Sequence, residues 1–194
     1  MKKIRFLLVG VGGQGTILAS NVLAELGIAL GYDTKKAEVH GMSQRGGSVI
    51  SHVSWAEQVF SPVIPEGEAD ILIAFEKLEA VRFLDGIRPD AMVLVNDHEI
   101  VPVTVSSGTG KYPSDEEMRA TFAPVTKNVH WVKGVKIAEE LGNTKAANVV
   151  LLGALSKILE HEAEPWLKVI EARVPPKFLE LNRKAFQAGR DAVG

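Results

Sequence analysis

The chain has 194 residues, a formal net charge of −2, 46% hydrophobic residues and 24% charged residues. These values are ordinary for a soluble globular domain that encloses its own core. The chain has no excess of basic residues of the kind that would indicate a nucleic-acid partner. Cysteine is absent, which excludes disulfides, thiolate-held zinc or iron–sulfur clusters, and a cysteine nucleophile.

The N-terminal stretch MKKIRFLLVGVGG begins with two lysines and an apolar run, as a signal peptide does. The run is short, however, and it leads into glycines without a small-residue cleavage site. Elsewhere the apolar stretches fall short of the roughly 18–20 residues that a membrane-spanning helix needs. We therefore expect a cytoplasmic protein with no membrane partner, whose chain opens with a buried strand.

Apolar periodicity divides the chain into alternating strands and helices. Continuous apolar runs predict strands buried on both faces, whereas the run at 48–56 alternates only in part. The predicted strands are 3–10, 33–41, 48–56, 70–75, 91–97 and 128–134. The predicted helices are 16–31, 76–87, one that starts after the serine cap at Ser114, 135–142, 143–160 and two in the tail that separate at Pro175-Pro176.

This order of elements predicts an α/β fold with helices on both faces of a sheet. We expect one three-layer α/β/α, Rossmann-like domain over 1–194, with a mixed but mainly parallel sheet. A helical tail over about 161–194 completes it. No internal repeat and no linker divides the chain.

A glycine-rich turn follows the first predicted strand and reads Gly10-x-Gly12-x-x-Gly15. Glycines at this spacing allow a tight turn, close approach of a ligand and close helix packing, and the next helix begins with free N–H groups. The turn therefore predicts either a phosphate or nucleotide site or only a tight strand-to-helix connection. For a dinucleotide, Glu38 is the candidate ribose acid, although it can lie inside the second strand instead of at its tip.

A second polar loop, in the stretch EVHGMSQRGGSV, joins the second and third predicted strands. An imidazole, an amide and a guanidinium in one loop favour a surface that faces anions or carboxylates. His40 is either a proton carrier or a hydrogen-bonded strand-end residue, and Arg45 is either an anion ligand or a surface ion-pair partner. The loop is expected beside the glycine turn, at the carboxyl ends of the strands.

The two stretches GVGGQGT and AEVHGMSQRGGSV together resemble the gamma-type subunits of the 2-oxoacid:ferredoxin oxidoreductases, and most closely the small subunit of the indolepyruvate type. The resemblance extends from Ile4 to about Leu159 and includes ADILIAFEKLEA and NVVLLGAL. Pyruvate-type gamma subunits are similar at the glycine turn but typically carry a different loop where this chain reads HGMSQRGG.

The resemblance implies a subunit of an enzyme that oxidatively decarboxylates 2-oxoacids to acyl-CoA and passes electrons to ferredoxin. It places thiamine diphosphate, Mg and the Fe–S clusters on a larger alpha subunit, with coenzyme A as co-substrate and no cofactor held tightly by this chain. The resemblance also implies roles for two sets of residues. A turn that faces a phosphate of coenzyme A consists of Gly10, Gly12, Gly13, Gln14, Gly15 and Thr16. The subunit contact or the lip of the active site is lined by His40, Gly41, Met42, Ser43, Gln44, Arg45, Gly46 and Gly47. We assign no catalytic residue and no metal ligand.

Three alternative functions stay open. The first is the gamma subunit of a pyruvate or 2-oxoisovalerate ferredoxin oxidoreductase, and the second is a stand-alone NAD- or FAD-binding oxidoreductase. The third is a scaffolding module without a ligand, in which case adding this chain to a partner subunit would not restore enzyme activity.

The remaining polar motifs favour structural roles. The other histidines show no metal-ligand spacing. Asp97, His98 and Glu99 can form a second lip of the cleft, but a solvated turn is the favoured interpretation. The stretch 106–111 lacks the spacing of a phosphate loop and is predicted to be a mobile loop. Trp55 and Trp131 are expected in the core, whereas Trp166 fits the core and an interface equally well.

Overall fold

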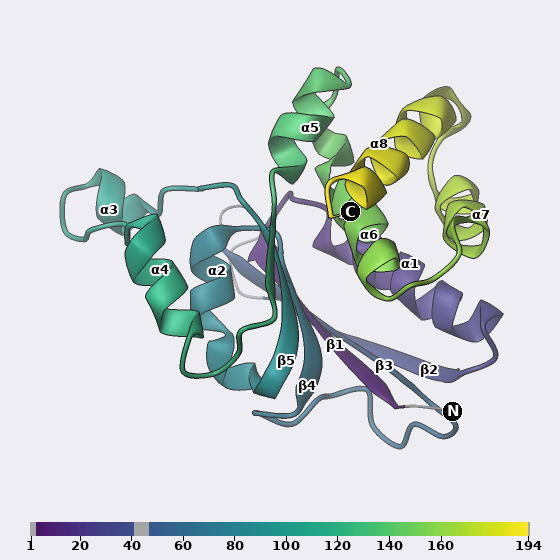
Figure 1. Ribbon diagram of the computed structural model, residues 1–194, viewed down its shortest axis with the longest axis horizontal. Coiled ribbons are helices and arrows are strands. Elements are labelled where there is room, and N and C mark those ends of the chain that lie inside the picture. The colour runs from purple at the N-terminus through teal and green to yellow at the C-terminus, as the bar shows by residue number, and fades with distance from the viewer. Residues whose placement is uncertain (1–2, 41–46, 194) are drawn as a thin grey trace.

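A sheet in the order β2-β3-β1-β4-β5-β6 forms the centre of the computed structural model, which describes residues 3–40 and 47–193, and for His40 the backbone alone (Figure 1). The strands are β1 (Ile4–Val11), β2 (Asp33–His40), β3 (Ser48–Ala56), β4 (Ala69–Ala74), β5 (Ile87–Asn96) and β6 (Val129–Val132). β3 runs antiparallel to both of its neighbours, whereas β1, β4, β5 and β6 pair in parallel. The predicted mixed, mainly parallel sheet is therefore confirmed.

Helices cover the two faces of the sheet unequally. The first face carries α1 (Thr16–Ala29), α5 (Gly134–Glu140), α6 (Ala147–Ile158), α7 (Ala163–Arg173) and α8 (Leu179–Asp191). The second face carries α2 (Lys77–Arg82) and α4 (Asp115–Phe122), and Figure 1 shows the two groups on opposite sides of the strands. This is the three-layer α/β/α arrangement expected from the order of elements.

The larger core lies between the sheet and the helices of the first face. Phe6, Leu8, Trp55 and Phe186 are fully buried there, and each such side chain contributes on the order of 2 kcal/mol through its removal from water. Trp166 is also fully buried in this core, which decides between its two interpretations. A smaller core on the second face packs strand residues against α2 and α4; its members include Leu7, Val9, Leu72, Val93 and Phe122.

α6 and α8 approach each other closely because two glycines lie at their contact. A Cβ on Gly189 would lie 1.9 Å from the carbonyl oxygen of Val150, and one on Gly153 would lie 2.0 Å from that of Phe186. Interiors pack at crystal-like density, so this contact leaves no room for a side chain. The C-terminal helix thereby becomes part of the first-face layer.

The predicted strands and helices are present, and the largest corrections to their boundaries concern α2, β5 and the start of α6. The helix expected over 76–87 ends at Arg82, and a 3-10 turn, η1 (Leu84–Gly86), follows it. A Cβ on Gly86 would lie 2.8 Å from a methyl carbon of Leu7, so the chain tightens here to fit against β1. β5 consequently begins at Ile87, four residues before its predicted start.

The helix expected over 143–160 likewise begins as a 3-10 turn, η2 (Thr144–Ala146), before α6. In the tail, α7 ends at Arg173 and η3 (Pro176–Phe178) precedes α8, as the Pro175-Pro176 pair predicts. The expectation that Trp131 lies in the core is wrong, because its ring is only partly buried and the Arg119 guanidinium lies 4.4 Å from its centroid.

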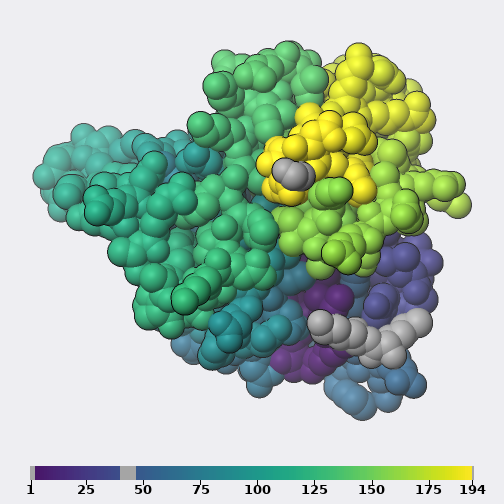
Figure 2. All heavy atoms as spheres, viewed as in Figure 1, coloured from purple at the N-terminus to yellow at the C-terminus, as the bar shows by residue number. Residues whose placement is uncertain are grey.

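The segment between β5 and α4 projects from the body of the molecule. It contains α3 (Val103–Ser106), a short helix that the sequence did not predict and that has no buried residue. The space-filling view shows this part of the chain as a protrusion at one end (Figure 2). Among the described residues, no helix is long and apolar enough to cross a membrane.

Candidate functional site

The glycine turn at the end of β1 is closed by the side chain of Gln14. The Val11 N–H donates to Gln14 Oε1 at 2.8 Å, and Gln14 Nε2 donates to the Phe75 carbonyl at 2.8 Å. Asn96 Nδ2 donates to the same carbonyl at 3.0 Å. These hydrogen bonds therefore connect the ends of β1, β4 and β5 at the carboxyl edge of the sheet.

Two of the turn glycines are required by the chain itself. A Cβ on Gly10 would lie 2.9 Å from both Gln14 Oε1 and the Phe75 Cβ. Gly15 has a φ of +83°, and a Cβ there would lie 2.2 Å from Asn148 Nδ2. These glycines allow close packing within the fold and need no ligand to explain them.

Gly13 differs from these two because no described residue lies close to it. It has a φ of +102°, and a Cβ on it would meet no atom of the described residues within 4 Å. Its backbone conformation therefore requires glycine, whereas packing against the described part of the chain does not.

The first turn of α1 offers an anion unoccupied donors. Gly15 caps the helix without a side-chain hydrogen bond, and no acidic residue lies in the first turn. Thr16 is 3% exposed, and its Oγ1 has no hydrogen-bond partner among the described residues. Free N–H groups and the positive end of the helix dipole favour a phosphate or carboxylate here.

The turn and the second polar loop meet, as their positions at the carboxyl ends predict. The Gly12 N–H donates to the Gly47 carbonyl at 3.0 Å. β2 ends at His40, which pairs with Val49, and Val11 pairs with Ser48. The His40 side chain and residues 41–46 (Gly41, Met42, Ser43, Gln44, Arg45 and Gly46) lie outside the described part, so their predicted role at the lip stays a prediction.

Glu38 lies inside β2, opposite Ser51 and two residues before the end of the strand. Its Oε1 accepts a hydrogen bond from Lys36 Nζ at 2.5 Å and lies 3.5 Å from Ser20 Oγ on α1. The carboxylate is therefore engaged between the sheet and α1. This position does not match the strand-tip acid of a dinucleotide site.

A buried ionic cluster, which the sequence interpretation missed, lies at the start of α2. The Glu76 side chain is 1% exposed and accepts hydrogen bonds from the N–H groups of Glu79 at 2.9 Å and Ile100 at 3.1 Å, and from the Tyr112 hydroxyl. Burial, together with the Glu76 carboxylate, raises the pKa of Tyr112 well above its ordinary value. Tyr112 therefore stays protonated as a donor.

Lys77 lies beside it and is 4% exposed. Its Nζ lies 2.6 Å from Glu99 and from Asp115, and 3.6 Å from Asp97. Burial works to lower the pKa of Lys77, but hydrogen bonds to Asp115 and Glu99 outweigh it and raise this pKa. Lys77 therefore remains a cation, and it is not poised as a base or nucleophile.

The cluster gives the stretch 97–99 a structural role, whereas its alternative role as a second lip of the cleft stays a prediction. Asp97 and Glu99 hold the start of the projecting segment on Lys77, and Asp115 holds its return. The signal for this arrangement is the pair Glu76-Lys77 directly after a buried strand. Within residues 3–40 and 47–193, no group of three or more His, Cys, Asp or Glu residues is placed to hold a metal ion.

Comparison with known proteins agrees with this architecture. Residues 5–192 match the family model described as pyruvate ferredoxin/flavodoxin oxidoreductase. The chain is 39% identical to indolepyruvate oxidoreductase subunit IorB of Pyrococcus horikoshii, over all of this chain and 97% of that protein.

Two solved structures share the fold. The gamma subunit of a keto/oxoacid ferredoxin oxidoreductase from Geobacter sulfurreducens has a TM-score of 0.76 at 25% identity, over 100% of this chain and 97% of that one. The 2-oxoglutarate:ferredoxin oxidoreductase of Magnetococcus marinus has a TM-score of 0.75 at 18% identity, over 100% of this chain but 31% of that longer chain. The resemblance predicted from the two glycine-rich stretches is thus confirmed, and the chain belongs to the pyruvate ferredoxin/flavodoxin oxidoreductase family.

Proposed function

We propose that this chain is the small subunit of a heteromeric 2-oxoacid:ferredoxin oxidoreductase of the indolepyruvate or arylpyruvate type. The enzyme converts the 2-oxoacid and coenzyme A to an acyl-CoA and carbon dioxide, and ferredoxin accepts the two electrons. The observation that carries this proposal is the identity of 39% with subunit IorB over the whole chain. The cytoplasm is the proposed location.

The larger subunit holds the redox groups in this proposal. Thiamine diphosphate, with Mg, supplies the carbanion chemistry of decarboxylation, and Fe–S clusters supply the electron path. This chain has no cysteine with which to hold such a cluster. Its own part is to complete and shape the active site that the larger subunit contains.

The glycine turn is the proposed contact with coenzyme A. The hydroxyl of Thr16, which has no partner among the described residues, and the free N–H groups at the start of α1 together favour a phosphate. The loop from His40 to Gly47 joins this turn at Gly12 and forms the proposed lip toward the larger subunit.

Replacing one hydroxyl tests the coenzyme A contact. In the assembled enzyme, Thr16→Val is expected to raise the KM for coenzyme A by about tenfold, because one hydrogen bond to a charged group contributes about 1.5 kcal/mol, while the KM for the 2-oxoacid stays unchanged. Ser20→Ala, one turn further along α1, is the matched control, since the Ser20 hydroxyl donates to the Ile17 carbonyl. An unchanged KM for coenzyme A in Thr16→Val would remove the turn from the proposed site.

Co-purification tests the subunit assignment itself. The chain is tagged, produced anaerobically in its host, and purified with whatever binds it. We expect a stoichiometric larger chain that carries thiamine diphosphate and Fe–S clusters, and faster turnover of indolepyruvate than of pyruvate. Preference for pyruvate or 2-oxoisovalerate would favour the alternative gamma-subunit assignment.

The remaining alternative is a stand-alone NAD or FAD enzyme. The engagement of Glu38 by Lys36 and Ser20 argues against a ribose contact at that carboxylate. Tight, saturable binding of NAD or FAD by the isolated chain, together with activity in the absence of any partner, would support this alternative and contradict the proposed function.

A further inference from the structure

The second face of the sheet lacks its helical cover on one half. α2 packs on β1, β4 and β5. In the described part, α1 is the one helix that packs closely on β2 and β3, and it lies on the first face. Figure 1 shows that a loop, residues 57–68, is what runs beneath β3 and β2 on the other side. This uncovered half is called the bare face below.

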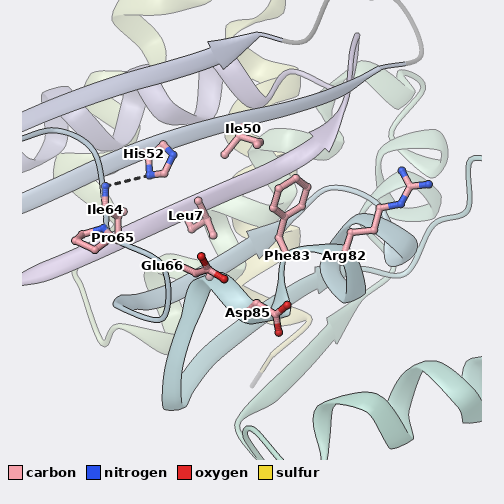
Figure 3. A pocket seen from close by; sticks show the side chains of 10 residues that line it. Leu7, Ile50, His52, Ile64, Pro65, Glu66, Arg82, Phe83 and Asp85 are labelled. Carbon is pink, nitrogen blue, oxygen red and sulfur yellow. Dashed lines mark hydrogen bonds between the residues drawn. The ribbon is translucent and has the colours of Figure 1, made fainter.

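A cavity of about 330 Å³ lies where the bare face meets α2 and η1 (Figure 3). Leu7 and Ile50 form its floor on the sheet, and Ile64 and Phe83 stand on opposite sides of it. His52 Nδ1 accepts a hydrogen bond from the Ile64 N–H at 3.2 Å and so fixes the loop to β3. The cavity is thus preformed, with an apolar interior.

Large hydrophobic side chains are also exposed on β2 and on the loop that covers the bare face. Phe60 is 86% exposed, Val63 is 55% exposed and Val39 is 50% exposed. Phe60 and Val63 belong to the covering loop, and Val39 lies on the bare face because it pairs with Ile50 across the strands. Exposed hydrophobic side chains on the same side of a sheet as a preformed apolar cavity are typical of a protein-binding surface.

The charge around the cavity has one predominant sign. Residues 57–70 contain four acidic residues and no lysine or arginine. Glu68 and Asp70 are paired with Arg5 and Arg88, and Arg82 is paired with Glu79. Within the described part, Glu66 and Asp85 at the rim have neither an ion-pair nor a hydrogen-bond partner. A complementary partner therefore presents apolar side chains flanked by basic ones.

The bare face is continuous with the proposed contact to the larger subunit. β2 and β3 are the strands that the loop from His40 to Gly47 connects, and Val39 directly precedes that loop. The same fold also occurs as 31% of a longer chain in the Magnetococcus marinus enzyme.

We propose that the larger subunit docks on the bare face, inserting an apolar side chain between Ile50 and Phe83 and setting basic side chains against Glu66 and Asp85. This inference rests on the proposed function, and it names the surface through which the two subunits assemble. The apolar side chain that fills the cavity is the anchor of this contact. The acidic rim orients the larger subunit and makes its binding depend on the salt concentration.

The test measures the affinity of the two purified subunits for one another. Val39→Asp combined with Val63→Asp is expected to raise the Kd about a hundredfold, because Val39 pairs with Ile50 and Val63 precedes Ile64, so that two charges enter beside the apolar cavity. Ile28→Asp is the matched control, since Ile28 is a hydrophobic residue of α1 that is 62% exposed on the first face, and its Kd should stay that of the native chain. The melting temperature of each isolated variant should equal that of the native chain.

A second variant tests the charge. Glu66→Lys combined with Asp85→Lys should raise the Kd about tenfold and reduce its dependence on salt. If both double variants bind as the native chain does, the larger subunit docks elsewhere and the inference is wrong, whereas the subunit assignment stands. If the native chain itself dimerises and the double variant of Val39 and Val63 abolishes the dimer but not binding of the larger subunit, the bare face is a self-contact and the inference is equally wrong. If the native chain does not bind the larger subunit at all, the proposed function fails first.

Discussion

The two faces of the central sheet differ in how many helices cover them and in the interactions that hold those helices in place. On the first face, five helices enclose a large core, and two glycines bring α6 and α8 into backbone contact. On the second face, a smaller core is held by two short helices, and the buried cluster of Glu76 and Lys77 attaches the segment between β5 and α4. The first face supplies stability within the chain, whereas the second face leaves surface for contacts outside it.

Truncating one phenylalanine on each face should give the largest contrast. Phe186 is fully buried in the first-face core, so Phe186→Ala should lower the free energy of unfolding by about 4 kcal/mol. Phe60 is 86% exposed, so Phe60→Ala should change it by less than about 0.5 kcal/mol. Chemical denaturation of the isolated chain measures both. Similar losses for the two variants would contradict the comparison.

Adding one methyl group tests packing density on the two faces. Gly189→Ala forces a Cβ against the Val150 carbonyl, and we expect a loss of about 3 kcal/mol. Gly86→Ala meets only the end of the Leu7 side chain beside a cavity, so the loss should stay below about 1 kcal/mol. If Gly86→Ala is the more damaging of the two, the second face is packed as rigidly as the first.

Removing a buried cation measures how much the polar cluster contributes to the second face. Lys77→Met leaves Asp97, Glu99 and Asp115 without their common partner, and we expect a loss of about 2 kcal/mol because these carboxylates are partly solvated. Lys111→Met removes an exposed lysine, paired with Glu117 at 3.4 Å, and should cost less than about 0.5 kcal/mol. Equal stability of the two variants, measured in the same denaturant series, would show that the cluster is dispensable.

Lowering the pH should weaken the attachment of the covering loop to the bare face, and this effect on stability should be smaller than those of the substitutions above. Burial lowers the pKa of His52 below 6.5, so the folded chain favours neutral imidazole, whose Nδ1 accepts the Ile64 N–H. This stabilisation is complete above pH 6.5 and declines as the pH falls, because the unfolded chain then takes up the proton more readily.

Melting temperatures between pH 8 and pH 5 check this, with His52→Gln as the variant. Burial also lowers the pKa of His130 and His161, so His52→Gln should flatten the acid side of the curve only in part. A curve identical to that of the native chain would exclude a contribution from His52.

Local patterns were sufficient for most of the fold. Apolar runs located the strands, Ser114 predicted the start of α4, and the two glycine-rich stretches identified the family. The end of α2 at Arg82 was not predicted, because the 3-10 turn that follows it packs against Leu7 on a strand far away in the sequence. The same holds for Trp166, since a tryptophan at a helix start carries no sign of whether another helix will cover it.

At the candidate site, too, some features followed from the sequence and others depended on contacts between distant segments. The residues of the glycine turn and their position beside Gly47 followed from spacing and from the rule that parallel strands end at one edge. Which turn glycines pack against the chain did not follow, because Gly15 is restricted by Asn148 from a helix over a hundred residues later. The partners of Lys77 were hidden for the same reason.

The amino-acid pattern alone specified an α/β chain without thiolates, with a strand, a glycine turn and a helix in that order, because periodicity, turn chemistry and composition are local properties. The unequal cover of the sheet, the cavity beside Ile50 and the buried cation of Lys77 arose only in the tertiary structure. Burial and charge pairing depend on which distant segments meet, and no window along the chain contains that information.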